Sequence, residues 1–227
     1  MIVRSLKNLS SNRVRVVFDD NTEAAIPMDL VVRNDLFSGT EVLPDRFSAI
    51  CAEAELLNAR DRALSLISYR PHSEKEVRDK LRHKGFSENA AEYAVKWLTE
   101  RNYLDDCRFA EELTFSYLRK EYGKRRIHAE LVRRGVARDT IHQVLKLLES
   151  PAGDTQAEDA RGISHRKTDE HESCLMWQGI DRYLEKHLPD PDDRENLRKI
   201  KAALFRKGFS SDEITSAVER FRVSHDL

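Results

Sequence analysis

Hydrophobic positions alternate near the start of the chain, where Val14, Val16 and Phe18 are separated by single residues. A period of two predicts a strand with one buried face. An Asp-Asp-Asn run follows and favours a turn, and the residues on either side of this strand and turn can supply partner strands. We therefore predict a small β-hairpin or sheet within residues 1–50, ending near Pro27 and followed by a short helix.

From about residue 52 the hydrophobic period becomes helical, and one motif recurs around Gly85, Gly135 and Gly208. In each copy, apolar residues stand four and eight positions before the glycine and six, nine, ten and thirteen positions after it. This spacing gives each flanking helix one apolar face. A glycine directly after a basic residue is typical of a helix C-terminus, where glycine takes the left-handed conformation. We therefore predict a mainly α protein with three tandem repeats of helix, helix, glycine turn and helix.

The spacing of the three glycines also predicts the domain limits. The third glycine lies further from the second than the second lies from the first, and the extra residues form a polar segment almost without large apolar side chains. Such a segment cannot supply a core face and is typical of a flexible linker. The predicted organisation is a β segment with its connection at 1–50, three-helix repeats at 52–101, 102–149 and 174–227, and a linker at 150–173.

The composition supports a helical protein. Charged residues make up 35% of the chain, against about 25% in an average globular protein, yet the net charge is −1. Few glycines and prolines interrupt the chain, which argues against collagen-like and β-solenoid proteins. No stretch approaches the roughly 20 apolar residues of a membrane span, and the N-terminus shows no secretory signal. Cys51, Cys107 and Cys174 match neither a disulfide framework nor zinc spacing, so we expect a cytoplasmic protein.

The motifs of common catalytic sites are missing from the sequence. It contains no G-x-S-x-G nucleophile motif, no glycine-rich phosphate loop and no H-E-x-x-H zinc motif. The adjacent Asp105 and Asp106 are interpreted as the start of a helix, where the helix dipole favours carboxylates, rather than as metal ligands. We expect no enzymatic activity, no metal and no cofactor. We interpret all eight histidines as surface residues: His72, His83, His128, His142, His165, His171, His187 and His225.

Basic residues recur around the middle helix of each predicted repeat, although the net charge of the chain is near zero. A single such cluster is equally well explained as a solvated helix face interleaved with acidic residues. Three equivalent clusters favour a basic strip that binds an acidic or nucleic-acid-like partner. The candidate contact residues are Arg70, Lys75, Arg78, Arg82, Lys84, Arg119, Lys120, Tyr122, Lys124, Arg125, Arg126, Arg133, Arg134, Arg198, Lys201 and Lys207.

With the repeat and its turns defined, the sequence resembles the RecX family of recombinase regulators. The resemblance covers about residues 60–148 and is carried by the segments Ala63–Val77, Lys84–Phe86, Tyr103–Asp106 and Gly123–Ile127.

This resemblance implies tandem three-helix repeats in an elongated, curved array. It further implies a monomer that binds the RecA nucleoprotein filament and modulates, in the direction of inhibition, its ATP hydrolysis and strand exchange in DNA recombination, DNA repair and the SOS response. Single- or double-stranded DNA is a further candidate partner. The alternative function is that of a helical DNA-binding protein that acts independently of recombinase.

Overall fold

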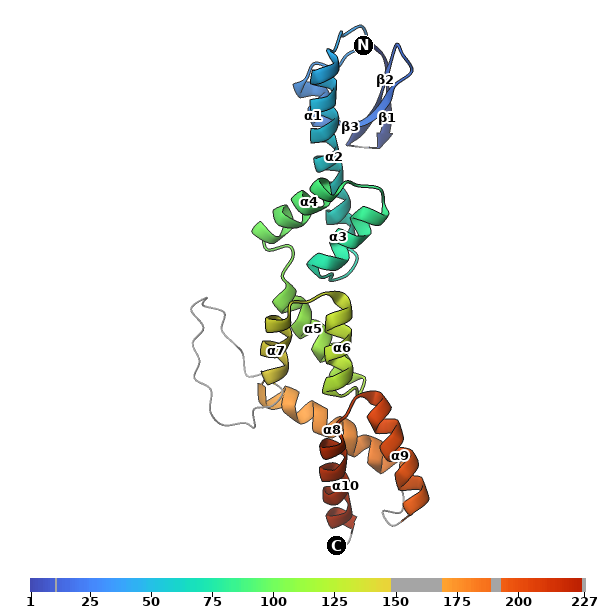
Figure 1. Cartoon of the computed structure of the whole chain (residues 1–227), viewed down its shortest axis with the longest axis vertical. Helices are drawn as coiled ribbons and strands as arrows, with labels where there is room; N and C mark the ends of the chain where they lie inside the picture. Colours follow the sequence, from blue (N-terminus) through green and yellow to red (C-terminus); the bar gives the residue numbers. More distant parts are fainter. Residues whose placement is uncertain (11, 148–168, 189–192, 226–227) are drawn as a thin grey trace. The chain divides into compact units, whose positions relative to one another are not determined.

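The chain divides into two units, Met1–Asp105 and Asp106–Leu227 (Figure 1). The computed structural model describes residues 1–10, 12–147, 169–188 and 193–225. It confirms the predicted fold class, because a small antiparallel sheet precedes a chain of helices.

The first unit begins with a three-stranded antiparallel sheet in the order β1-β2-β3. Val14, Val16 and Phe18 on the middle strand are buried, as their alternation predicts. They belong to a hydrophobic cluster that also holds residues of the helices following the sheet. The elements are β1 (Val3–Ser10), β2 (Arg13–Phe18), β3 (Glu23–Pro27) and the short helix α1 (Met28–Arg33).

The long helix α2 (Pro44–Ile67) contributes to two hydrophobic clusters. Ile50 and Ala54 are buried in the cluster of the sheet, whereas Ala59 and Ala63 are buried in the cluster of the first repeat. The helix begins at Pro44, because proline is well tolerated in the first helical turn. The hydrophobic period becomes evident only near residue 52, because the small alanines of this helix give a weak apolar pattern. The predicted boundary after residue 50 therefore falls inside a continuous helix.

The remaining helices follow the predicted order of the repeats. They are α3 (Glu74–His83), α4 (Glu88–Glu100), α5 (Asp106–Arg119), α6 (Lys124–Arg134), α7 (Arg138–Leu147), α8 (Asp169–His187), α9 (Arg194–Lys207) and α10 (Ser211–His225). Helix α8 begins at Asp169 rather than at residue 174, because its first turns are polar and give no hydrophobic signal. Residues 150–168 of the predicted linker lie outside the described residues.

The three glycine turns have the same geometry, which confirms the repeat. Gly85, Gly135 and Gly208 all have a positive φ, between 79° and 97°. In each turn the residue after the glycine donates its N–H to the carbonyl oxygen five residues earlier, the bond that closes a helix end. The three pairs are Phe86 to Leu81 (3.2 Å), Val136 to Leu131 (3.1 Å) and Phe209 to Leu204 (3.2 Å).

Serine side chains cap the N-termini of helices in the first and third repeats. The Oγ atoms of Ser73, Ser87 and Ser210 each accept a hydrogen bond from the backbone N–H three residues later. At Ser210 the bond is reciprocal, because Glu213 accepts from the Ser210 N–H at 2.7 Å. These caps satisfy N–H groups that a helix start leaves free, so they fix where each helix begins.

The hydrophobic clusters follow the two units. The first unit holds one cluster around the sheet and another in the first repeat. The second and third repeats instead share a single cluster, in which Ile127 and Leu131 of α6 are buried together with Ile200 and Leu204 of α9. No described helix is long and apolar enough to cross a membrane.

Candidate partner-binding surface

One histidine is buried, contrary to the expectation from the sequence. His72 is 4% exposed in the turn before α3. Its Nδ1 lies 2.8 Å from the Arg70 carbonyl oxygen and its Nε2 lies 2.5 Å from the Lys80 ammonium. The ring therefore donates from Nδ1 and accepts at Nε2, which requires the neutral form, and burial lowers the pKa of His72. The prediction failed because a turn residue carries no periodic signal.

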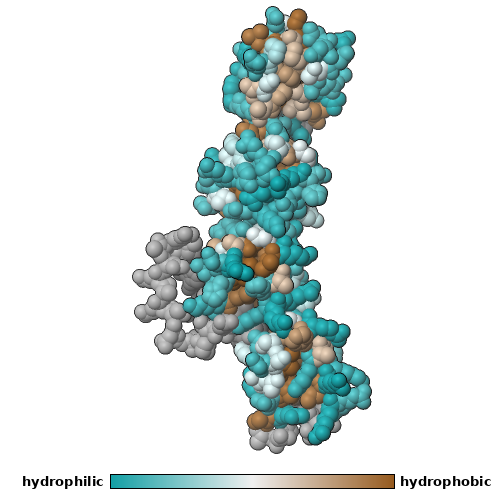
Figure 2. Space-filling model, in the orientation of Figure 1, coloured by the Kyte–Doolittle hydropathy of each residue, from teal (hydrophilic) through white to brown (hydrophobic). Residues whose placement is uncertain are grey.

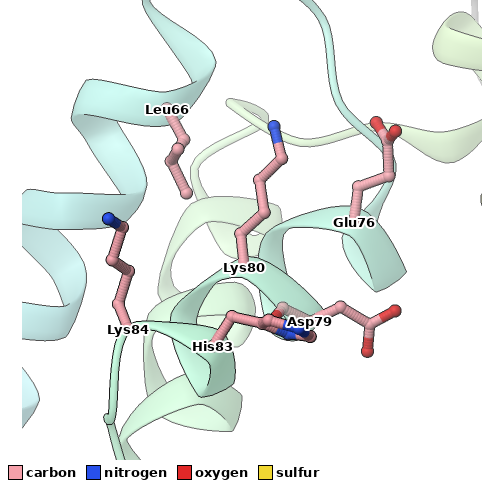
Figure 3. A pocket seen from close by; sticks show the side chains of 6 residues that line it. All are labelled: Leu66, Glu76, Asp79, Lys80, His83 and Lys84. Atoms are coloured by element: carbon pink, nitrogen blue, oxygen red, sulfur yellow. The ribbon is translucent and has the colours of Figure 1, made fainter.

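An open groove of about 540 Å³ lies beside α3 in the first unit. Figure 3 shows Leu66 and Lys84 on one side of this groove and the carboxylates of Glu76 and Asp79 on the other. Both signs of charge thus line it, which is unsuited to selecting a ligand of one sign. Among the residues that the structure describes, no three His, Cys, Asp or Glu side chains are placed to hold a metal ion.

The predicted basic residues of the first repeat are largely interleaved with acidic ones. Three of the five arginines and lysines form ion pairs, whereas Lys75 and Lys84 are exposed. This arrangement matches the alternative of a solvated face with alternating charges. The pairs are Arg70 with Glu76 (3.1 Å), Arg78 with Glu92, and Arg82 with Glu88.

Two basic residues at the end of α6 share one buried carboxylate. Arg133 and Arg134 lie 2.6 and 2.8 Å from Glu130, whose side chain is 7% exposed. The hydrogen bond from Arg133, and to a smaller extent that from Arg134, lowers the pKa of Glu130 to about 2 despite its burial. The two arginines therefore hold a buried charge and are only partly available to a partner.

Cations lie over aromatic rings where α5 ends and α6 begins. The Arg119 guanidinium lies 4.4 Å from the Phe115 ring centroid, and Arg126 lies 5.8 Å from that of Tyr122. Tyr122 packs against Tyr117, with centroids 5.3 Å apart, and Lys120 lies 5.7 Å from the Tyr117 ring. These contacts gather Lys120, Tyr122 and Arg126 around the two tyrosine rings, of which Tyr122 is half-buried, whereas Arg119 packs separately on Phe115. Lys124, another of the predicted residues, is half-buried in the first turn of α6.

The C-terminal end of α9 meets the N-terminal end of α6, as Figure 1 shows. The Gly123 N–H donates to the Lys207 carbonyl oxygen at 3.0 Å, and the Arg125 N–H donates to the Gly208 carbonyl oxygen at 3.1 Å. The free donors of one helix thus satisfy the free acceptors of the other. Sequence reasoning missed this junction, because the contacting residues are far apart in the chain.

Lys207 belongs to this junction through its side chain as well. Its ammonium lies 3.1 Å from Glu121 and 4.6 Å from the Tyr183 ring centroid. Glu121 has a positive φ of 60° and also pairs with Arg182 of α8 at 3.7 Å. The predicted contact residue Lys207 of α9 therefore joins α8 and the turn between α5 and α6, with its side chain 27% exposed.

The junction aligns two helix faces into one surface, which we call the junction strip. The Arg125 guanidinium of α6 lies 4.7 Å from the ring centroid of Phe205 on α9 and so connects the two faces. Sequence reasoning identified the cations of this surface but missed its hydrophobic residues, which are about half exposed. Figure 2 shows hydrophobic patches among the hydrophilic surface of the second unit. The junction strip consists of Arg198, Lys201 and Phe205 on α9 and Arg125 and Val132 on α6.

Comparison with protein families finds three matching models, one for each repeat. They are described as the first, second and third three-helix domains of RecX, and they match residues 59–98, 105–145 and 180–218.

Individual relatives agree with these matches. The regulatory protein RecX of Caldanaerobacter subterraneus subsp. tengcongensis is 25% identical over 218 residues, which are 96% of this chain and 98% of the relative. That of Trichlorobacter lovleyi is 33% identical over 159 residues, which are 70% of this chain and 92% of the relative.

Solved structures show the same fold. A crystal structure of a regulatory protein RecX has a TM-score of 0.63 at 19% identity and covers 97% of this chain and 98% of its own. RecX from Lactobacillus salivarius has a TM-score of 0.59 at 22% identity and covers 74% and 97%.

Proposed function

Because the chain belongs to the RecX family of regulatory proteins, we propose that it binds the RecA nucleoprotein filament and inhibits its ATP hydrolysis and strand exchange. Among its relatives, those of Caldanaerobacter and Trichlorobacter carry the name of regulatory protein. The proposed partner is a protein filament on DNA, and the proposed role is to change the activity of that filament rather than to catalyse a reaction.

The junction strip is the observation in this chain that carries the proposal. Arg125, Arg198 and Lys201 lie on it, and the described structure records no ion pair for any of them. None of the five strip residues is acidic, and Glu195, one turn before Arg198, is paired with Lys199 at 2.8 Å. Such a surface attracts an acidic partner, and the attraction weakens as salt screens it.

The proposal predicts that the protein slows ATP hydrolysis by recombinase filaments formed on single-stranded DNA. The charge reversal Arg125→Glu should raise the protein concentration needed for half-maximal inhibition about tenfold, because one favourable charge becomes a repulsive one at the centre of the strip. The measurement is the rate of ATP hydrolysis as the protein is titrated, for wild type and variant.

Lys7→Glu is the matched control. Lys7 is exposed on β1 opposite Arg15 of β2, so its reversal changes the net charge equally without straining the sheet. It should leave inhibition unchanged. An unaltered rate of hydrolysis at saturating wild-type protein would contradict the proposed function.

The second candidate function, DNA binding independent of recombinase, also draws on the basic residues. It predicts binding to free single-stranded DNA whose affinity falls steeply with salt, with a slope that reflects several neutralised phosphates. Tight binding of this kind together with an unchanged hydrolysis rate would favour this second function over the first.

A further inference from the structure

We infer that the junction strip docks onto an acidic protein face with an apolar recess, and that it does not bind the phosphate backbone of nucleic acid. This inference rests on the proposed function and specifies which component of the nucleoprotein filament the strip contacts.

The strip exposes large hydrophobic side chains on both of its helices. Phe205 is 49% exposed and Val132 is 51% exposed. On α9, Arg198, Lys201 and Phe205 follow the i, i+3, i+7 spacing of one helix face, and on α6 Arg125 and Val132 are also seven residues apart. Each face therefore runs about 10 Å along its helix.

The junction holds the two faces together before any partner arrives. The backbone hydrogen bonds from Gly123 and Arg125 fix the ends of the helices, and the Arg125–Phe205 contact at 4.7 Å joins their side chains. A surface that is already ordered loses little conformational entropy on binding. The junction strip thus has the pre-organisation that a docking surface requires.

The chemistry of the strip favours a protein partner. Arginine and aromatic residues are enriched in the centres of protein interfaces, and their apolar parts need an apolar surface to exclude water. A phosphate backbone offers charge but no such surface, and the aliphatic Val132 cannot stack on a base as an aromatic ring can. A partner that offers carboxylates around an apolar recess satisfies both the cations and the exposed hydrophobic residues.

The test replaces the hydrophobic residues and leaves every charge in place. The double variant Phe205→Ala/Val132→Ala should bind recombinase filaments at least about tenfold more weakly than wild type, while its affinity for free single-stranded DNA stays the same. Filament binding is measured by co-sedimentation or fluorescence anisotropy, and circular dichroism with thermal unfolding checks that the variant is folded.

The chain offers a matched control in Phe37→Ala/Val32→Ala. These residues are 54% and 58% exposed in the first unit, so the control removes the same two side-chain types from equally open positions. The inference is overturned if the folded strip variant binds filaments as wild type does, if the control loses as much affinity, or if the strip variant loses free-DNA binding to the same degree. Wild-type protein that fails to bind filaments would instead refute the proposed function itself.

Discussion

Glu130 lies on α6 with 6% of its surface exposed, and both Arg133 and Arg134 donate hydrogen bonds to it. A buried carboxylate is costly unless it is paired, and removing its partners exposes that cost. The pairing lowers the pKa of Glu130 from 4.5 to about 2, so the folded protein keeps the charge where the unfolded chain would gain a proton.

The substitution Glu130→Gln should lower the free energy of unfolding by about 2 kcal/mol at pH 7, because two arginines lose their anionic partner. Because the pKa is lowered in the folded state, the ionised Glu130 contributes its full stabilisation at pH values above 4.5. This contribution is lost as the pH falls toward about 2. The difference between variant and wild type should therefore be smaller at pH 3 than at pH 7. Urea unfolding at the two pH values measures it.

Glu185→Gln provides the comparison, since Glu185 is an exposed carboxylate on α8. It should change the unfolding free energy little at either pH. A cost of Glu130→Gln that stays the same at both pH values would show that the charge of Glu130 is not what stabilises the helix.

At the scale of single residues, the sequence predicted burial better than it predicted polar contacts. Ile127, Leu131 and Ile200 are buried where helical periodicity places them. The periodicity carries no information on His72 in its turn, and it cannot tell an arginine that pairs with a buried carboxylate from one that faces a partner. Spacing of three or four residues permits the Glu130 pairs, but burial by the neighbouring helices decides their strength.

At the scale of elements, the glycines of the junction have a steric role beyond closing a helix. A Cβ atom at Gly208 would lie 2.5 Å from the Arg126 backbone nitrogen, and one at Gly123 would lie 2.5 Å from the Phe209 backbone nitrogen. Gly123 has a φ of −83°, which any residue can adopt, so its role is to allow this close approach. Gly208 allows the approach and supplies a φ of +97°.

Three alanine substitutions separate these two effects. Gly85→Ala should cost about 1 kcal/mol, because φ is +86° there but no atom beyond the two neighbouring residues lies within 4 Å of the new Cβ. Gly123→Ala should cost about 2 kcal/mol through steric overlap alone, and Gly208→Ala about 3 kcal/mol because it combines both effects.

Hydrogen exchange provides the local measurement. The Gly123 and Arg125 amides are hydrogen-bonded across the junction, so Gly208→Ala should reduce the protection of both, and Gly123→Ala that of Arg125. Gly85→Ala should leave both protected. Equal protection in all three variants would contradict the steric role of the junction glycines.

The elements themselves were predictable to different degrees. The glycine turns have local signals, and the structure confirms them at Gly85, Gly135 and Gly208. The junction has no local signal, because it depends on how the second and third repeats pack through their shared cluster. For the same reason, the sequence predicted which basic residues belong to the strip but not the contact between Arg125 and Phe205 that joins its two helices.

At the scale of the whole molecule, the two units have separate hydrophobic cores. The clusters of the first unit contain buried residues up to Leu104, and that of the second unit begins at Phe109. The N-terminal sheet and the first repeat share α2, which predicts that they form one folding unit despite the change in sequence pattern near residue 52. The pattern reports where helices begin, but it does not report that one helix serves two cores.

A fragment of residues 1–105 should therefore fold on its own and unfold cooperatively with urea, as monitored by circular dichroism. A fragment of residues 52–105 follows the boundary that the sequence pattern predicts and lacks the start of α2 and the sheet. It should unfold at a lower urea concentration, because so short a chain buries too little apolar surface to be more than marginally stable. Equal midpoints for the two fragments would show that the sheet and the first repeat are independent.

The hydrogen bonds between α9 and α6 also decide how the Gly-Lys-Arg-Arg segment at 123–126 can meet a phosphate. A helix start that binds an anion does so through its free backbone N–H groups, against which the phosphate lies. Here the Gly123 and Arg125 N–H groups donate to Lys207 and Gly208. The carbonyl groups at the C-terminal end of α9 thus occupy the position that an anion would take, so the side chains of this segment are what a phosphate could contact.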